Sequence, residues 1–216
     1  MEAIWPFLVV LCIIALIFAV TLYLDKKRAE ALEAFAREIG FTFVGNDRTR
    51  IPNMVGGFEL FNKGRSRTVK HLLYGPRGRA NVYLFDYSYR TGGGKNSTTH
   101  VQTVVLFQSE ALQLPRFFLV PENFFHKIGN LFGYRDIDFD AYPQFSKQYL
   151  LRGEDEDRIR QCFNHRILSF FESRQGLYTE GNGAQLLYYR VRQVVQPKNL
   201  QSFLDEAEQV YRTFAP

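Results

Sequence analysis

The sequence contains only two cysteines and four histidines, and this scarcity excludes a scaffold held together by disulfides. Cys12 lies inside a long apolar run and Cys162 is the only other cysteine, so the remainder of the chain cannot form a disulfide within itself. The scattered histidines form no HExxH or HxH pattern, and there is no GxSxG, SxxK or protein-kinase signature. These absences argue against the common motif-bearing enzymes and metal sites, and leave open an active site assembled from distant residues.

Three short patterns resemble chemical sites, and each is better interpreted as structural. Residues 92–97, GGGKNS, lack the first glycine of a phosphate-binding loop, have asparagine in place of the metal-binding hydroxyl, and join two predicted strands. The three aspartates of residues 136–140 would share one face of an extended segment, but the glycine and distal glutamate of a calcium loop are missing, which favours an exposed acidic edge. Cys162 and His165 have helical spacing, yet a cysteine among apolar residues is typical of an inert buried thiol. We therefore expect no cofactor and no metal.

The chain begins with an apolar run that is long enough to cross a bilayer. Residues 4–24, IWPFLVVLCIIALIFAVTLYL, carry no charge and would form a helix of about 30 Å, the thickness of a hydrocarbon core. A cleaved secretory signal would need a cationic start, a shorter apolar stretch and an A-x-A cleavage site, and none of these is present. The pattern predicts a short tail at residues 1–3 and a single transmembrane helix at 4–24.

The charges that flank this run predict its orientation. No Lys or Arg precedes it, whereas Lys26, Lys27 and Arg28 follow it directly, and basic residues near the end of a span are retained on the cytoplasmic side. We therefore expect a single-pass protein whose C-terminal domain is cytoplasmic. A domain on the periplasmic side is the alternative, because the asymmetry rests on one short flank.

Beyond the apolar run, the sequence predicts a juxtamembrane helix and then a soluble α+β domain. Residues 25–40 have apolar positions three and four apart and end at Gly40, which is typical of a helix with one apolar stripe. After Gly40 the period changes to two, as in strands. Strands are predicted at residues 41–44, 58–61, 68–74, 81–90, 99–108, 117–120, 145–151, 177–180 and 185–195, and helices at 121–131, 154–173 and 197–214. This succession favours an antiparallel sheet with packed helices over residues 41–216, either as one domain or as two packed lobes, 41–135 and 136–216.

Asp86 is unusual because it lies between aromatic residues in the strongest of these strand patterns. Aromatic side chains at positions 83, 85, 87 and 89 alternate with Val82, Leu84, Asp86 and Ser88. The alternation predicts that Asp86 lies on the solvent face of the sheet together with Ser88. If the aromatic residues lined a ligand groove instead, Asp86 would lie only at its rim.

Several segments resemble those of a known kind of protein. The segment FSKQYLLRGEDEDRIRQCFNHRILSFFES, followed by LYTEGNGAQLLYY, is similar to a strand, acidic turn, helix and hairpin of uncharacterised bacterial membrane-anchored proteins. The segments FDYSY, QTVVLF and LPRFFLVPE resemble the same family, and together the segments cover about half of the chain. The resemblance implies a bacterial inner-membrane location, and it supplies no activity, ligand or site residue.

A basic segment follows the predicted anchor. Residues 46–100 contain ten basic and three acidic residues, a net charge of +7, whereas the whole chain carries +5. Because this segment follows the anchor closely, it could lie against anionic lipids. The basic residues that we single out for this role are Lys26, Lys27, Arg28, Lys63, Arg65, Arg67, Lys70, Arg77 and Arg79. An ordinary solvated face is an equal interpretation, and a nucleic-acid surface is disfavoured because no recognition motif accompanies the charge.

These features together favour a non-enzymatic module that is tethered to the membrane and binds a protein partner or anionic lipid headgroups. The alternative is a membrane-bound hydrolase or transferase with a dispersed active site. A deep cleft with two or more converging titratable groups would favour the enzyme, and a filled interior would favour the binding module.

Overall fold

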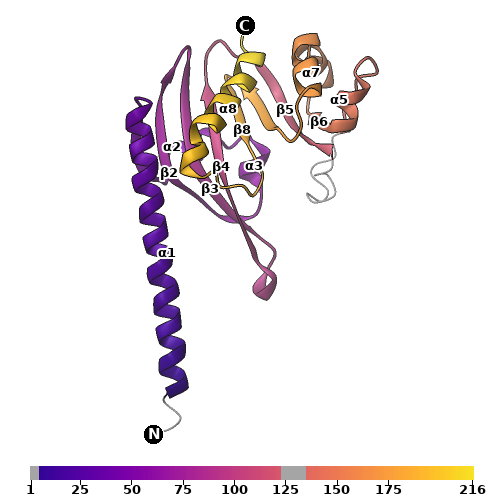
Figure 1. Cartoon of the computed structure of the whole chain (residues 1–216). Coiled ribbons are helices and arrows are strands. Elements are labelled where there is room, and N and C mark those ends of the chain that lie inside the picture. The colour runs from indigo at the N-terminus through magenta and orange to yellow at the C-terminus, as the bar shows by residue number, and fades with distance from the viewer. Residues whose placement is uncertain (1–4, 123–134) are drawn as a thin grey trace.

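The structure, a computed structural model, describes residues 5–122 and 135–216. The N-terminal helix α1 (Trp5–Glu38) extends away from an eight-stranded antiparallel sheet against which further helices pack (Figure 1). The α+β class and the antiparallel sheet were expected from the sequence and are confirmed. The predicted tail at residues 1–3 and most of the helix predicted at 121–131 lie outside the described residues.

Helix α1 is continuous, so no break separates the two segments predicted at 4–24 and 25–40. The side chains of residues 7–24 are exposed, and α1 is long and apolar enough to span a membrane. Further along the same helix, Leu32, Phe35 and Ala36 are buried against the sheet. The helix ends because Gly40 adopts a φ of 74°, which lets the Phe41 N–H donate to the Ala36 carbonyl oxygen at 2.7 Å.

The sheet has the strand order β1-β2-β3-β4-β8-β7-β5-β6, and every neighbouring pair is antiparallel. Its strands are β1 (Thr42–Asp47), β2 (Arg65–Arg77), β3 (Ala80–Thr91), β4 (Thr98–Gln108), β5 (Leu114–Pro121), β6 (Tyr149–Gly153), β7 (Tyr178–Gly183) and β8 (Gln185–Tyr189). Strand β5 lies between β7 and β6, so strands from residues 41–135 and 136–216 interleave in one sheet.

Helices cover both faces of this sheet. On one face, the C-terminal part of α1 packs with α6 (Glu156–Cys162), α7 (His165–Glu172) and α8 (Leu200–Phe214) over a continuous apolar core. On the other face, α2 (Arg50–Met54) and α3 (Glu59–Asn62) cover a second core. The sheet is therefore a buried central layer rather than a layer with one solvated face.

Strand β3 illustrates the consequence of this double covering. Val82 and Leu84 point into the core under α1, whereas Phe85 and Tyr87 point into the core under α2 and α3. The alternation read from the sequence is correct, but both of its faces are buried. Strands buried on both faces need apolar residues in both registers, and the central part of β3, from Val82 to Tyr89, meets this requirement except at Asp86 and Ser88.

Three strand predictions were wrong at the residue level, one of them because β8 ends at Tyr189 and residues 190–195 are not part of a strand. Residues 58–61 do not form a strand; Phe58 precedes helix α3 and the other three belong to it. The prediction failed because a run of four apolar and acidic residues fits a strand and a helical turn equally well. Residues 145–148 belong to α5 (Pro143–Gln148), which starts with a proline in its first turn, and strand β6 begins only at Tyr149. The hairpin around Gly181–Gly183 and the helices within 154–173 and 197–214 are present as predicted, the last one opening with the short 3-10 helix η3 (Pro197–Asn199).

Candidate functional site

A cluster of paired, mostly buried charged side chains lies where the apolar stretch of α1 ends and the helix first contacts the sheet. Arg28 of α1 points at Asp86 of β3, and two of its nitrogens bind the carboxylate: Nε to Oδ2 at 2.5 Å and Nη2 to Oδ1 at 2.7 Å. The third nitrogen, Nη1, donates to the carbonyl oxygen of Val195 at 2.9 Å. The side chains of Arg28 and Asp86 are only 17% and 7% exposed. A two-point guanidinium–carboxylate pair at this burial fixes both the distance and the rotation of the helix.

The two neighbouring strands complete the surroundings of Asp86. Thr103 of β4 donates its hydroxyl to Oδ1 at 2.9 Å and accepts the Val195 N–H at 3.0 Å. Nδ1 of His71, on β2, lies 2.9 Å from Oδ2. Burial alone would raise the pKa of Asp86, but the hydrogen bonds from Arg28 and His71 hold it below its ordinary value. The carboxylate is therefore charged throughout the physiological pH range.

A β-bulge in β2 brings two adjacent side chains to this face. The pairing of β2 with β3 shifts between Lys70 and Leu73, and His71 has a positive φ of 53°. Lys70 Nζ consequently lies 3.1 Å from the Asp25 carboxylate of α1, and His71 Nε2 lies 3.5 Å from the same group. Over about one turn of α1, the helix therefore contributes one acid and one base, Asp25 and Arg28, and the sheet supplies a partner of opposite charge for each.

The prediction that Asp86 faces solvent was wrong. Asp86 is on the face shared with Ser88, as the alternation indicated, but α1 covers that face at this point. The sequence contained a signal for the pairing, since an acid in a buried strand needs a cation and Arg28 is the first arginine after the apolar run. What the sequence does not show is that α1 folds back onto β3.

A second buried carboxylate, Glu180 of β7, lies on the opposite face of the sheet. It accepts hydrogen bonds from the backbone N–H groups of Glu59 and Leu60, at 2.5 and 3.1 Å, and from the Tyr189 hydroxyl at 2.8 Å. Its donors are neutral and its exposure is 1%, so burial raises the pKa of Glu180 to about 7. Burial likewise lowers the pKa of Lys63, whose positive charge partly offsets the rise in the pKa of Glu180. Glu180 holds the first turn of α3 on the sheet and is closed to solvent.

The basic residues singled out from the sequence fall into separate places. Lys26 and Lys27 are exposed on α1, whereas Arg28 and Lys70 are occupied by the ion pairs with Asp86 and Asp25. Arg77 contacts Asp205 and Glu208 of α8 at 3.6 and 3.2 Å.

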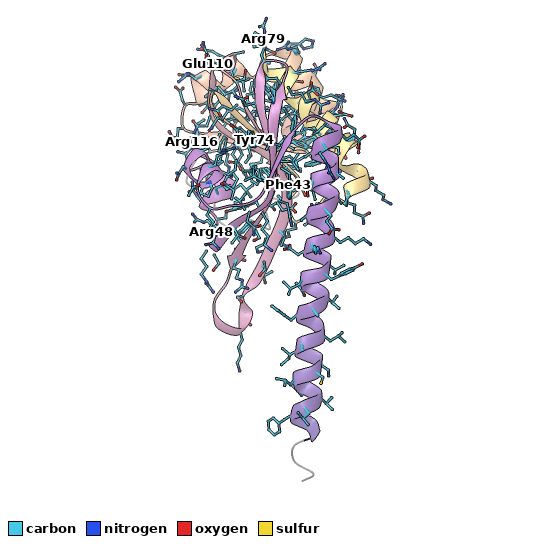
Figure 2. All side chains as sticks on the ribbon, turned by 90° about the vertical axis from the view of Figure 1, so that its left-hand side faces the viewer. Phe43, Arg48, Tyr74, Arg79, Glu110 and Arg116 are labelled. Carbon is cyan, nitrogen blue, oxygen red and sulfur yellow. The ribbon has the colours of Figure 1, made fainter. Side chains whose placement is uncertain are left out.

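The other four residues lie at opposite ends of β2. Arg65 and Arg67 are exposed at its beginning, directly after the half-buried Lys63. Arg79 follows its end and lies at the far end of the sheet from the N-terminus of α1 (Figure 2). The structure therefore does not gather the basic segment on one face.

The remaining sequence candidates occupy structural positions. The glycine-rich stretch contains the 3-10 helix η1 (Gly94–Asn96) in the loop between β3 and β4. Asp136 accepts the Leu151 N–H at 3.0 Å, and burial raises its pKa to about 6. Burial also raises the pKa of Cys162 to about 11, so its thiol stays protonated at neutral pH. Among the described residues, no group of three or more His, Cys, Asp or Glu side chains is placed to hold a metal ion.

Open grooves on the surface do not converge on these groups. One groove, of about 630 Å³, is lined by Lys147, Gln148, Tyr178 and Arg190 among others. A second, of about 500 Å³, adjoins it at Arg190 and runs along the start of α8. Neither groove is lined by Asp86 or Glu180, so the two buried carboxylates have no route to a ligand through them.

A helix that is long and apolar enough to span a membrane, continued into a covered antiparallel sheet, fits a membrane-anchored module. No protein-family model matches the sequence, and no curated protein matches it. Among solved structures, the crystal structure of the mycobacterial trehalose monomycolate transport factor A, TtfA, is similar to this chain with a TM-score of 0.61. The similarity covers 87% of this chain and 92% of that one at 11% sequence identity, which shows a shared fold.

Replacing Asp86 with asparagine should destabilise the domain by about 3 kcal/mol, because the mostly buried Arg28 guanidinium loses its counter-charge. Asp25→Asn is the matched control: its carboxylate is 42% exposed, so the loss should stay below about 1 kcal/mol. The measurement is urea-induced unfolding of the full-length chain in mild detergent. Equal effects of the two substitutions would show that the pair does not fix the junction.

The stability of the domain should fall as the pH rises from about 4.5 to about 7. In that window the unfolded chain releases the Glu180 proton at its ordinary pKa of 4.5, whereas the folded chain keeps it up to about 7, so the folded state loses on the order of 3 kcal/mol. Glu180→Gln adds a constant offset and removes the larger part of this slope; the part that remains belongs to Asp136, whose pKa is raised to about 6. Unfolding curves across the window, with the exposed Glu154→Gln as control, measure the difference; parallel curves for wild type and Glu180→Gln would contradict the assignment.

Proposed function

We propose that this chain is a single-pass, non-enzymatic module of the inner membrane that presents its sheet domain on the cytoplasmic side and holds a protein partner there. The apolar stretch of α1 and the basic residues Lys26 and Lys27 that follow it support the anchoring and the orientation. The same two residues are exposed and are suited to contact anionic headgroups next to the span.

One observation carries the proposal: the anchor and the domain are joined rigidly. The helix that contains the apolar stretch continues without interruption into the domain core, where Leu32 and Phe35 are buried. The Arg28–Asp86 pair fixes its rotation. A tethered enzyme that acts on soluble molecules works equally well on a flexible linker. A fixed pose relative to the bilayer is useful to a module that must meet a partner embedded in the same membrane.

The fold neighbour supports this direction. TtfA, which shares this fold, is a trehalose monomycolate transport factor. We extend this to the present chain as a proposal: the partner belongs to a membrane-embedded transport assembly. The alternative enzyme finds no comparable support among the described residues, because Glu180 is sealed and Asp86 is neutralised by Arg28.

The proposed partner is tested with a variant in which a flexible insertion separates the apolar stretch of α1 from the domain while the domain itself is unchanged. A four-residue Gly-Ser insertion between Leu24 and Asp25 keeps Arg28, Leu32 and the core intact but uncouples the pose of the domain from the span. Affinity isolation of the cross-linked full-length chain from native membranes should recover a membrane-embedded protein, and the insertion should lower its yield by about tenfold. The same insertion after Pro216 is the control. Recovery of no such protein, or an unchanged yield, would overturn the proposal.

The orientation has a separate test. A reporter fused after Pro216 that is active only in the cytoplasm should be active, and one that requires export should be silent, because the basic flank of α1 is retained inside. Changing Lys26 and Lys27 to glutamine should weaken this preference, whereas changing Lys198 and Arg212, which lie far along the chain, should not. An active exported reporter on the wild-type chain would place the domain in the periplasm.

A further inference from the structure

The hairpin formed by β3 and β4 extends beyond β8 on one side, is accompanied by β2 as far as Arg65↔Arg90 on the other, and runs along the direction of the anchor. The two strands pair in unbroken register from Asn81↔Gln108 to Thr91↔Thr98, whereas β8 pairs with β4 only from Val104 to Gln108. In Figures 1 and 2 the free end of this hairpin points toward the N-terminal end of α1. The hairpin therefore projects toward the side from which the apolar stretch leaves the domain.

The Arg28–Asp86 contact fixes how far the hairpin reaches. From Asp86 the strand continues five residues to Thr91, about 17 Å at the rise of an extended strand. From Arg28 back to Leu24, where the apolar run ends, the helix covers only four residues, or about 6 Å. The headgroup layer on each side of a bilayer is roughly 5–7 Å thick. Even with the strand inclined to the helix, the hairpin end is long enough to enter that layer.

The chemistry of the hairpin end suits a surface of phosphates. Residues 88–101 and the adjoining residues 63–70 contain no acidic side chain. Lys70 is paired with Asp25 of α1, and the other exposed cations there are Arg65, Arg67, Arg90 and Lys95. In the described part of the chain none of the four pairs with a carboxylate; the three arginines donate to neutral oxygens, as Arg65 does to the Gly92 carbonyl oxygen at 2.5 Å. The loop offers glycine, asparagine, serine and threonine and no large apolar side chain, which favours contact with headgroups over insertion into hydrocarbon.

We infer that the end of the β3–β4 hairpin, through Arg65, Arg67, Arg90 and Lys95, is a second membrane contact that binds anionic lipid headgroups in the leaflet from which α1 emerges. This inference rests on the anchoring proposed above. It also divides the basic residues singled out from the sequence: Arg65 and Arg67 belong to the contact, whereas Arg77 and Arg79, at the other end of β2, do not.

The test uses the full chain reconstituted in vesicles of phosphatidylcholine alone or with three parts in ten of phosphatidylglycerol. A fluorophore on Asn96→Cys, in a Cys12→Ala/Cys162→Ala background, reports quenching by lipids that carry a nitroxide on the headgroup. We expect quenching with the anionic lipid, and its decline at high salt. The same fluorophore on Arg79→Cys should stay unquenched.

Matched charge removal separates this contact from a general effect of net charge. Arg90→Gln/Lys95→Gln should lower the equilibrium constant of the hairpin contact by about 25-fold, roughly fivefold for each cation, whereas Arg77→Gln/Arg79→Gln should leave it unchanged. Equal effects of the two pairs, equal quenching without anionic lipid, or no quenching at all would overturn the inference. Extraction with alkaline carbonate distinguishes the two proposals: a chain released from the vesicles contradicts the anchoring, and a chain retained without quenching contradicts the hairpin contact alone.

Discussion

The ion pair between Arg28 and Asp86 is the contact on which the relation between the anchor and the sheet depends. Apolar packing of Leu32, Phe35 and Ala36 draws the helix onto the sheet, but such packing is not directional. The guanidinium is planar and grips the carboxylate at two points, so it accepts one rotation of the helix. A shift of one residue in α1 would turn Arg28 by about 100° and leave the buried Asp86 carboxylate with only His71 and Thr103 as partners.

The sheet handles its two buried acids in opposite ways. Asp86 receives a guanidinium and remains ionised, whereas Glu180, on the other face, receives neutral donors and has a pKa near neutrality. The difference follows from what each carboxylate holds. Asp86 binds Arg28 and so joins the sheet to the long helix α1. Glu180 accepts hydrogen bonds from the N–H groups at the start of the short helix α3, which have no partner within that helix.

Much of this fold could be predicted because its patterns are local. The apolar run, the stop at Gly40, the alternation in β3 and β4, and the acidic start of α6 depend on residues close together in the sequence. The site could not be predicted, because Arg28 and Asp86 are 58 residues apart and meet only after α1 folds onto β3. The strand predicted at residues 58–61 was wrong for the same reason. The acid that stabilises the helical turn there, Glu180, lies more than a hundred residues further along the sequence.

Because α1 is unbroken, it transmits any change in the tilt of its apolar part directly to the sheet. At about 1.5 Å per residue, its 34 residues form a rod of about 51 Å whose two ends cannot tilt independently. A transmembrane helix adjusts to a thinner or thicker bilayer by changing its tilt angle relative to the bilayer normal. Because no hinge separates the span from the sheet, such a change would swing the whole domain and alter its height above the lipid. In the anchoring proposed above, the orientation of the domain is therefore coupled to the thickness of the membrane.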